Sequence, residues 1–198
     1  MSKRSVANVG YKSEYHKEFI LSFRKLAERH SRFETWSDFI NMCACSISNS
    51  TDGRFFDQRE ALYMERIGRY DREERNLIVH MFSLIVTALD RNPAQDFLGE
   101  IFGALNLHNE WHGQFFTPYH IGELMVRTVI DKLPQAAEAS DTVSVMDPFC
   151  GAGCLLIACA NEANKMDVQY QRKLLFYAQD VDRIAALMCY IQLSFLGC

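Results

Sequence analysis

The sequence pattern that most constrains the fold is an apolar stretch that runs into a glycine-containing turn and then into a helix. Residues 142–147 are rich in Val, Thr and Met and predict a buried strand that ends in Asp147. The turn Gly151-Ala152-Gly153 follows, and residues 154–163 predict a helix. Glycine allows the backbone to turn sharply and a ligand to approach it closely. The free N–H groups at the start of the helix then become available to that ligand.

A second unit of the same kind comes next in the chain. Residues 174–178 predict a strand, and residues 184–191 carry apolar side chains at helical spacing. Strand, helix, strand and helix in this order are typical of a parallel α/β sheet. Asp180 follows the second strand, where a carboxylate can accept hydrogen bonds from both hydroxyls of a ribose. The alternative is that Asp180 or Asp182 only caps the next helix.

Residues 13–110 predict a mainly helical N-terminal part. Apolar residues within 77–89 recur at helical spacing, and Asp71 with Glu74 three positions later is the sequence pattern of a capping box. Further helices are predicted over 15–30, 33–48 and 97–105. Composition predicts a loop over 48–53 and a polar connection over 134–141.

A third motif lies between these two parts. Residues 113–118, with the sequence Gly-Gln-Phe-Phe-Thr-Pro, place two aromatic residues directly before a predicted helix. Thr117 is the expected N-cap of this helix and Pro118 its first residue. The aromatic residues alone can be explained as a hydrophobic staple. In a functional interpretation, the free N–H groups and the Thr117 hydroxyl face a small zwitterion or anion.

Taken in order, these motifs resemble those of the N6-adenine DNA methyltransferases. The three are GQFFTP at 113–118, DPFCGAG at 147–153 and AQDVD at 178–182. The likeness is greatest to the modification subunits of type I restriction systems and to related single-chain enzymes. It covers roughly residues 94–198, and the sequence DFLGEIF at 96–102 resembles the helical lead-in of that family.

The resemblance implies an α/β fold with two parts. A helical N-terminal domain over residues 1–110 would precede a truncated Rossmann-like fold over 111–198, of the kind that uses S-adenosylmethionine (SAM) to transfer methyl groups. The parent activity would be methyl transfer from SAM to the N6 amino group of adenine in DNA, and this chain would be the cofactor-binding portion. Two alternatives stay open: a non-catalytic SAM-binding regulatory or split-enzyme module, and another Rossmann-like nucleotide-binding protein. Against a dinucleotide such as NAD, Leu156 replaces the third glycine of G-x-G-x-x-G.

The resemblance also assigns roles to individual residues. Thr117 would bind the methionine carboxylate of SAM, and Asp147 would orient the turn and meet the methionine amine directly or through water. Asp180 would hold the ribose hydroxyls, a position where the family more often has Glu. Cys150 replaces a small residue of the family, so we expect it to pack rather than to act as a nucleophile. The cofactor-binding residues implied in this way are Gln114, Phe115, Phe116, Thr117, Pro118, Asp147, Pro148, Cys150, Gly151, Ala152, Gly153 and Asp180.

The catalytic motif of the family does not occur in this sequence. That motif is Asn or Asp followed by Pro-Pro and an aromatic residue; it holds the adenine amino group and stacks on the flipped base. Residues 92–95, Asn-Pro-Ala-Gln, lack the second proline and the aromatic residue. We therefore expect no catalytic residue in this chain and no methyl transfer by the chain alone.

Charge and composition set limits on the partners. Of the 198 residues 48% are hydrophobic, which is enough for a packed core, and the net charge is −4. Residues 1–110 carry 15 basic against 16 acidic side chains and residues 111–198 carry 6 against 9, so neither part is expected to grip DNA by itself. We expect DNA to be bound through regions largely outside this chain. The apolar sheet edges favour a complementary polypeptide or a second copy as partner. The resemblance to type I modification subunits also implies a specificity subunit as partner.

The remaining features point to a cytoplasmic protein without metal. The longest apolar run, 77–89, is interrupted by polar residues and is shorter than the ~20 residues that span a bilayer, so we expect no membrane segment. The first 14 residues contain no apolar stretch, which predicts no signal peptide. Seven cysteines are then expected to be reduced thiols. Cys43 and Cys45 lack a second close pair, so we expect them to be buried helix residues rather than zinc ligands.

Overall fold

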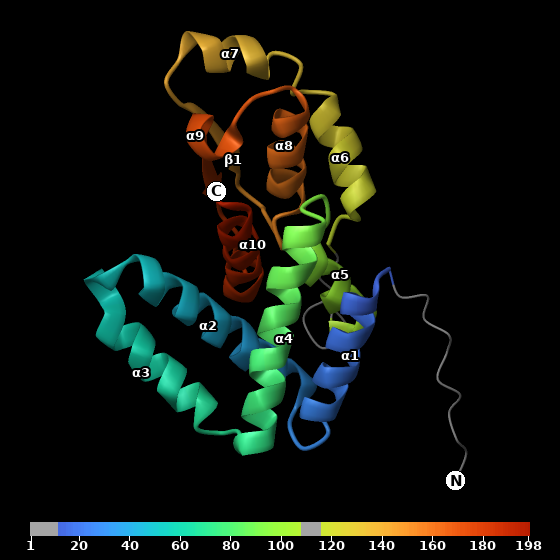
Figure 1. The fold of residues 1–198 in the computed structure, drawn as a ribbon, viewed down its shortest axis with the longest axis vertical. Coiled ribbons are helices and arrows are strands. Elements are labelled where there is room, and N and C mark those ends of the chain that lie inside the picture. The colour runs from blue at the N-terminus through green and yellow to red at the C-terminus, as the bar shows by residue number, and fades with distance from the viewer. Residues whose placement is uncertain (1–11, 108–115) are drawn as a thin grey trace.

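The computed structural model describes residues 12–107 and 116–198 (Figure 1). Most of the described chain is helical, and it contains one two-stranded sheet. The elements are α1 (Glu14–Leu26), α2 (Arg32–Thr51), the 3₁₀ turn η1 (Gly53–Phe55), α3 (Phe56–Ile67), α4 (Arg72–Arg91), α5 (Phe97–Ala104), α6 (Tyr119–Arg127), α7 (Leu133–Ala139), β1 (Val143–Asp147), α8 (Cys154–Lys165), α9 (Tyr170–Lys173), β2 (Leu174–Ala178) and α10 (Arg183–Leu196).

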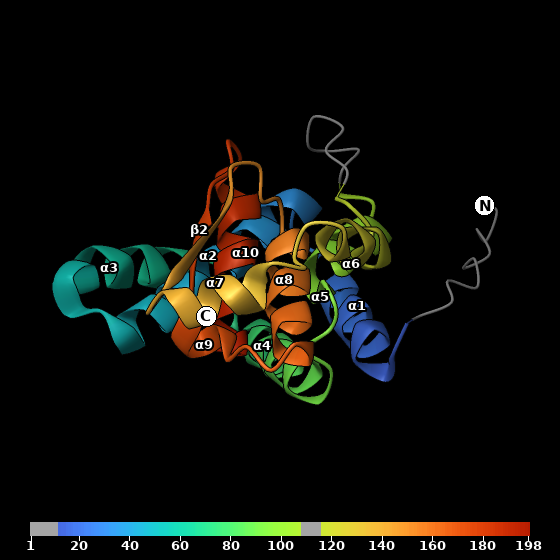
Figure 2. The same ribbon diagram turned by 90° about the horizontal axis from the view of Figure 1, so that it is seen from above.

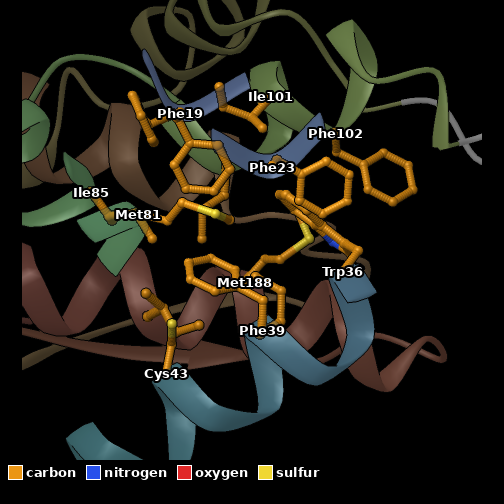
Figure 3. Close-up of a cluster of buried hydrophobic side chains, with 14 of the residues drawn as sticks. Phe19, Phe23, Trp36, Phe39, Cys43, Met81, Ile85, Ile101, Phe102 and Met188 are labelled. Atoms are coloured by element: carbon orange, nitrogen blue, oxygen red, sulfur yellow. The ribbon is translucent and has the colours of Figure 1, made fainter. Parts of the chain in front are cut away.

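The N-terminal part is a group of helices around an aromatic core, as the periodicity of the sequence predicts. Phe19 of α1 lies 5.5 Å from Phe39 and 6.2 Å from Trp36, measured between ring centroids, in edge-to-face arrangements. Figure 3 shows these rings facing one another across the helices. The predicted capping box is confirmed at the start of α4: Asp71 accepts from the Glu74 N–H, and the Glu74 carboxylate accepts from the Asp71 N–H.

Helix α10 belongs to this core although it comes from the C-terminal end of the chain. Ile184, Met188 and Ile191 are buried in the same cluster as the rings of α1 and α2. In Figure 1, α10 lies beside α4 and ends above α2, and Figure 3 shows Met188 next to Phe39. The helical part and the sheet-containing part are therefore joined by a common core.

The two predicted strands form a parallel pair. β1 and β2 run in register from Val143 opposite Leu174 to Asp147 opposite Ala178. Val143 and Val145 pack toward the buried residues of α8 and α10, whereas Met146 and Tyr177 on the other face are 64% and 52% exposed. The mixed α/β fold class is thus confirmed. The wider Rossmann-like sheet stays a prediction, because the described residues contain only these two strands.

Two of the predicted connections are helical instead. α2 continues to Thr51, so the loop predicted over 48–53 was wrong. The polar side chains at this end do not interrupt the helix, because the hydroxyls of Ser50 and Thr51 donate back to the Ile47 carbonyl at 2.6 and 3.3 Å.

The polar connection predicted over 134–141 was also wrong. Its first six residues belong to α7, whose alanines favour helix and whose proline lies in the first turn, where it removes no helical hydrogen bond. Leu133 and Ala137 bury the inner side of this helix. Among the described residues, every helix falls short of the length or the apolar content that a membrane span would require.

Candidate functional site

The turn after β1 has a backbone conformation that favours glycine. Gly151 and Gly153 have φ angles of +53° and +100°. A Cβ atom at Gly153 would lie 2.8 Å from the Cys189 sulfur and 3.3 Å from its Cα, so α10 approaches the turn too closely for a side chain there. The backbone conformation of the turn and the close approach of its neighbours therefore explain why both positions are glycine.

Main-chain hydrogen bonds join this turn to the end of β2. The Cys150 N–H donates to the Gln179 carbonyl at 2.9 Å, and the Gln179 N–H donates to the Asp147 carbonyl at 3.0 Å. The Asp147 side chain accepts from the Phe149 N–H through Oδ1, also at 3.0 Å. The two strands thus continue their pairing beyond the sheet, and the predicted motifs at 147–153 and 178–182 come together at one edge.

Asp180 connects the two motifs directly. Its Oδ2 accepts from the Gly151 N–H at 2.8 Å, and its Oδ1 accepts from the Asp182 N–H at 2.9 Å. An ionised carboxylate has about four acceptor sites, so these two bonds leave further sites for a ligand. Asp182 is the N-cap of α10 and accepts from the Ile184 N–H at 2.7 Å. Of the two aspartates considered as helix caps, Asp182 is the one with this role.

The segment before α6 forms another wall of the site. Thr117 was predicted as the N-cap, but the helix begins one residue later with Pro118 at the N-cap position and no side-chain cap. The reason is that Pro118 has an extended ψ of 137°, which leaves Thr117 outside the helix and exposed. Phe116 lies 5.1 Å from Phe102, between ring centroids, and its ring is next to Gly151.

Helix α6 is fixed against the start of α8. A Cβ atom at Gly122 would lie 2.5 Å from the Cys154 sulfur, so the two helices pack closely here. The buried Glu162 carboxylate pairs with Arg127 at 3.1 Å and with Lys165 at 2.6 Å, which ties the other ends of the helices together. Figure 2 shows α8 between α6 and α10. The wall that carries Phe116 and Thr117 is therefore held by α8 itself.

These elements enclose a cavity of about 300 Å³ at the glycine turn. This volume is at the lower end of the range of small-molecule sites. The lining residues are Phe116, Thr117, Asp147, Phe149, Cys150, Gly151, Ala152, Cys154, Leu155, Asp180 and Val181. Among the residues expected to bind cofactor, Pro118, Pro148 and Gly153 adjoin this lining without being part of it, and Gln114 and Phe115 lie outside the described residues.

The cavity offers both hydrogen-bond acceptors and donors. Asp147 is 9% exposed, and its Oδ2 has no hydrogen-bond partner among the described residues. Helix α8 begins at Cys154 after the N-cap Gly153, which provides no side-chain cap, so N–H groups of the first turn have no intrahelical partner. One end of the cavity can therefore receive hydroxyl or ammonium groups, and the start of α8 can receive a carboxylate.

The thiols of Cys150, Cys154 and Cys189 around the turn are buried. Burial raises the pKa of Cys154 to about 12. A hydrogen bond to the neighbouring Cys150 sulfur, together with burial, raises the pKa of Cys189, and the same bond lowers the pKa of Cys150. Within the part of the chain that the structure describes, no group of three or more His, Cys, Asp or Glu side chains is placed to hold a metal ion. Cys43 and Cys45 are buried in α2.

Four lining residues were missing from the sequence prediction: Phe149, Cys154, Leu155 and Val181. Each is adjacent to a predicted residue or within the first turn of the helix after the glycines, so proximity to the motifs was the available signal. Phe149 and Val181 are 82% and 100% exposed, and such exposure of apolar side chains cannot be derived from the sequence pattern.

Comparison with known proteins adds one finding. A family model described as N-6 DNA methylase matches residues 94–197, just over half of the chain. No curated protein matches the chain, and neither does any solved structure. The matched range contains α5, α6, both strands and every residue that lines the cavity.

Proposed function

The chain belongs to the N-6 DNA methylase family, and from this premise we propose that the cavity at the glycine turn binds SAM. The observation that carries the proposal is the convergence of three separate motifs. Thr117, Gly151 and Asp180 are far apart in the sequence, yet all three line one cavity. A cavity built from a strand end, a glycine turn and a helix start is also a common site for nucleoside ligands in α/β proteins.

The residues present fit the parts of this cofactor. Asp180 keeps acceptor sites for the ribose hydroxyls, and Asp147, which also lines the cavity, provides a carboxylate for the methionine ammonium group. The start of α8 and the Thr117 hydroxyl suit the methionine carboxylate. The exposed side chains of Phe149 and Val181 provide apolar surface for the adenine ring. When bound, SAM supplies an activated methyl group.

We further propose that the methyl acceptor is the N6 amino group of adenine in DNA, reached only with help from regions outside this chain. Methyl transfer requires a flipped base with its amino group aligned to the donor. The sequence contains no Asn/Asp-Pro-Pro-aromatic motif for that alignment. The chain therefore binds cofactor, and a complementary polypeptide or specificity subunit of a cytoplasmic restriction-modification system supplies the contacts to DNA. Self-association through the sheet edges is the alternative partnership.

Calorimetric titration of the purified chain tests the cofactor proposal. SAM and its demethylated product, S-adenosylhomocysteine, are expected to bind, whereas NAD is expected to produce no binding heat. Circular dichroism of the same sample shows that the protein is folded. Folded protein that gives no heat with either SAM or S-adenosylhomocysteine at millimolar concentration would contradict the proposal. Preferential binding of NAD would support the other nucleotide-binding class instead.

A further inference from the structure

A chain of buried hydrogen bonds connects the glycine turn to the helical part of the protein. Gln192 of α10 is fully buried, and its Nε2 donates both to Asp96 Oδ1 and to the Ala152 carbonyl, each at 2.8 Å. Its Oε1 accepts from the Leu98 N–H at 3.0 Å. Both amide protons and the amide oxygen are therefore in use, which fixes the orientation of this side chain.

Asp96 is the partner of Gln192 on the helical side. It is the N-cap of α5, is 2% exposed, and accepts from the Gly99 N–H through Oδ1 at 2.9 Å. Glycine at position 99 leaves space for this carboxyl group, because a Cβ atom there would collide with it. Burial raises the pKa of Asp96 to about 6. Burial of a carboxyl group costs free energy, and hydrogen bonds must offset that cost. The hydrogen bonds that Asp96 makes therefore matter for both folding and position.

Ala152 is the point where this chain reaches the cofactor turn. It lies between the two positive-φ glycines, is 1% exposed and lines the cavity. On the sheet side the turn is held by the bonds from Cys150 to Gln179 and from Gly151 to Asp180. The bond from Gln192 holds it from the opposite side, where the helical part lies.

We propose that Gln192 and Asp96 are positioning residues, which set the geometry of the glycine turn for cofactor binding from the helical part of the chain. Asp96 orients the Gln192 amide, and the amide holds the Ala152 carbonyl. The N-terminal helices then contribute to cofactor affinity as well as to folding. This inference rests on the proposed function, because the turn that it positions is the one assigned to SAM.

The test uses variants of the full chain. Gln192→Met keeps the length of the side chain and removes all three hydrogen bonds. We expect SAM to bind about tenfold more weakly, since one buried hydrogen bond is worth about a factor of ten. Amide hydrogen exchange across residues 149–153 should become faster. Asp96→Ala should weaken SAM binding similarly, and the double variant should be no weaker than Gln192→Met, because Asp96 acts through Gln192. Asp96→Asn retains an acceptor oxygen and should restore affinity to within about threefold of wild type.

Asp38→Asn is the matched control. Asp38 is a buried carboxylate of the helical part that accepts from Tyr70 at 3.1 Å and pairs with Arg66, far from the turn in the hydrogen-bond network. This variant should lower the melting temperature but leave both SAM affinity and exchange at 149–153 unchanged. A purely structural role predicts the same pattern for Gln192→Met, and that result would overturn the proposal.

The outcomes separate this inference from the proposed function. If the wild-type chain binds neither SAM nor S-adenosylhomocysteine, the proposed function fails, and hydrogen exchange alone decides whether Gln192 positions the turn. If Gln192→Met does not fold, the comparison of Asp96→Ala with Asp96→Asn decides. Equal SAM affinities for these two variants would contradict the positioning role.

Discussion

Replacement of Asp180 by alanine is predicted to weaken SAM binding by about 10- to 150-fold. A hydrogen bond to a charged group contributes about 1.5–3 kcal/mol, and every 1.4 kcal/mol is a factor of about ten in affinity. The carboxylate that would bind the ribose is the same one that accepts from the Gly151 and Asp182 N–H groups. The substitution therefore removes the ribose contact and also releases the turn that forms the cavity.

Asp182→Ala is the matched control for this prediction. Asp182 caps α10 through its bond to the Ile184 N–H, so its loss should lower the free energy of unfolding by about 0.5–2 kcal/mol. SAM affinity should change by no more than about twofold, because Asp182 does not line the cavity. Calorimetric titration gives the affinities and urea unfolding gives the stabilities. Equal losses of SAM affinity in the two variants would refute the assignment of Asp180 as the ribose carboxylate.

Three further predictions concern the turn, the buried carboxyl group and catalysis. Gly153→Ala should lower the free energy of unfolding by about 2–5 kcal/mol in urea titrations, because its φ of +100° strains an L-residue and the new methyl group overlaps Cys189; a loss below 1 kcal/mol would show that α10 moves aside. Asp96 binds its proton more tightly when folded, with a pKa of about 6, so wild-type stability relative to Asp96→Asn should fall by about 2–3 kcal/mol in total as the pH rises from about 3 to about 7, and then stay constant. A pH-independent difference in urea unfolding would contradict this sign. The purified chain alone should incorporate no labelled methyl groups from SAM into unmethylated DNA, and robust incorporation would place catalysis in residues that we have not identified.

The parts of the fold that the sequence could predict are those with strong local patterns. The strands at Val143–Asp147 and Leu174–Ala178 are short apolar runs bounded by polar residues, and the capping box of α4 is formed by Asp71 and Glu74, only three positions apart. The two connections were predicted wrongly because a polar composition does not by itself indicate a loop. The end of α2 is polar but satisfies its hydroxyls within the helix, and α7 is an alanine-rich helix with a proline in its first turn.

The candidate site could also be predicted only in part from the sequence. Motif order placed Thr117, Gly151 and Asp180 in one site, and the structure places them around one cavity. Their roles toward SAM stay predictions. That Asp180 accepts from the Gly151 N–H could not be predicted, because this hydrogen bond depends on how the two strands are paired. The contact between Asp96 and Gln192 joins residues 96 positions apart, and only the packing of α10 against α5 creates it.

Photochemical crosslinking of SAM tests the central claim most directly. SAM labelled in its methyl group is irradiated on the purified wild-type chain, and the labelled peptides are identified by mass spectrometry with unlabelled S-adenosylhomocysteine as competitor. We predict competitor-sensitive label in peptides that contain Phe116 and Thr117, residues 147–155, or Asp180 and Val181. Competitor-sensitive label confined to the helical residues 12–107, or to α7, would contradict the assignment of this cavity to SAM.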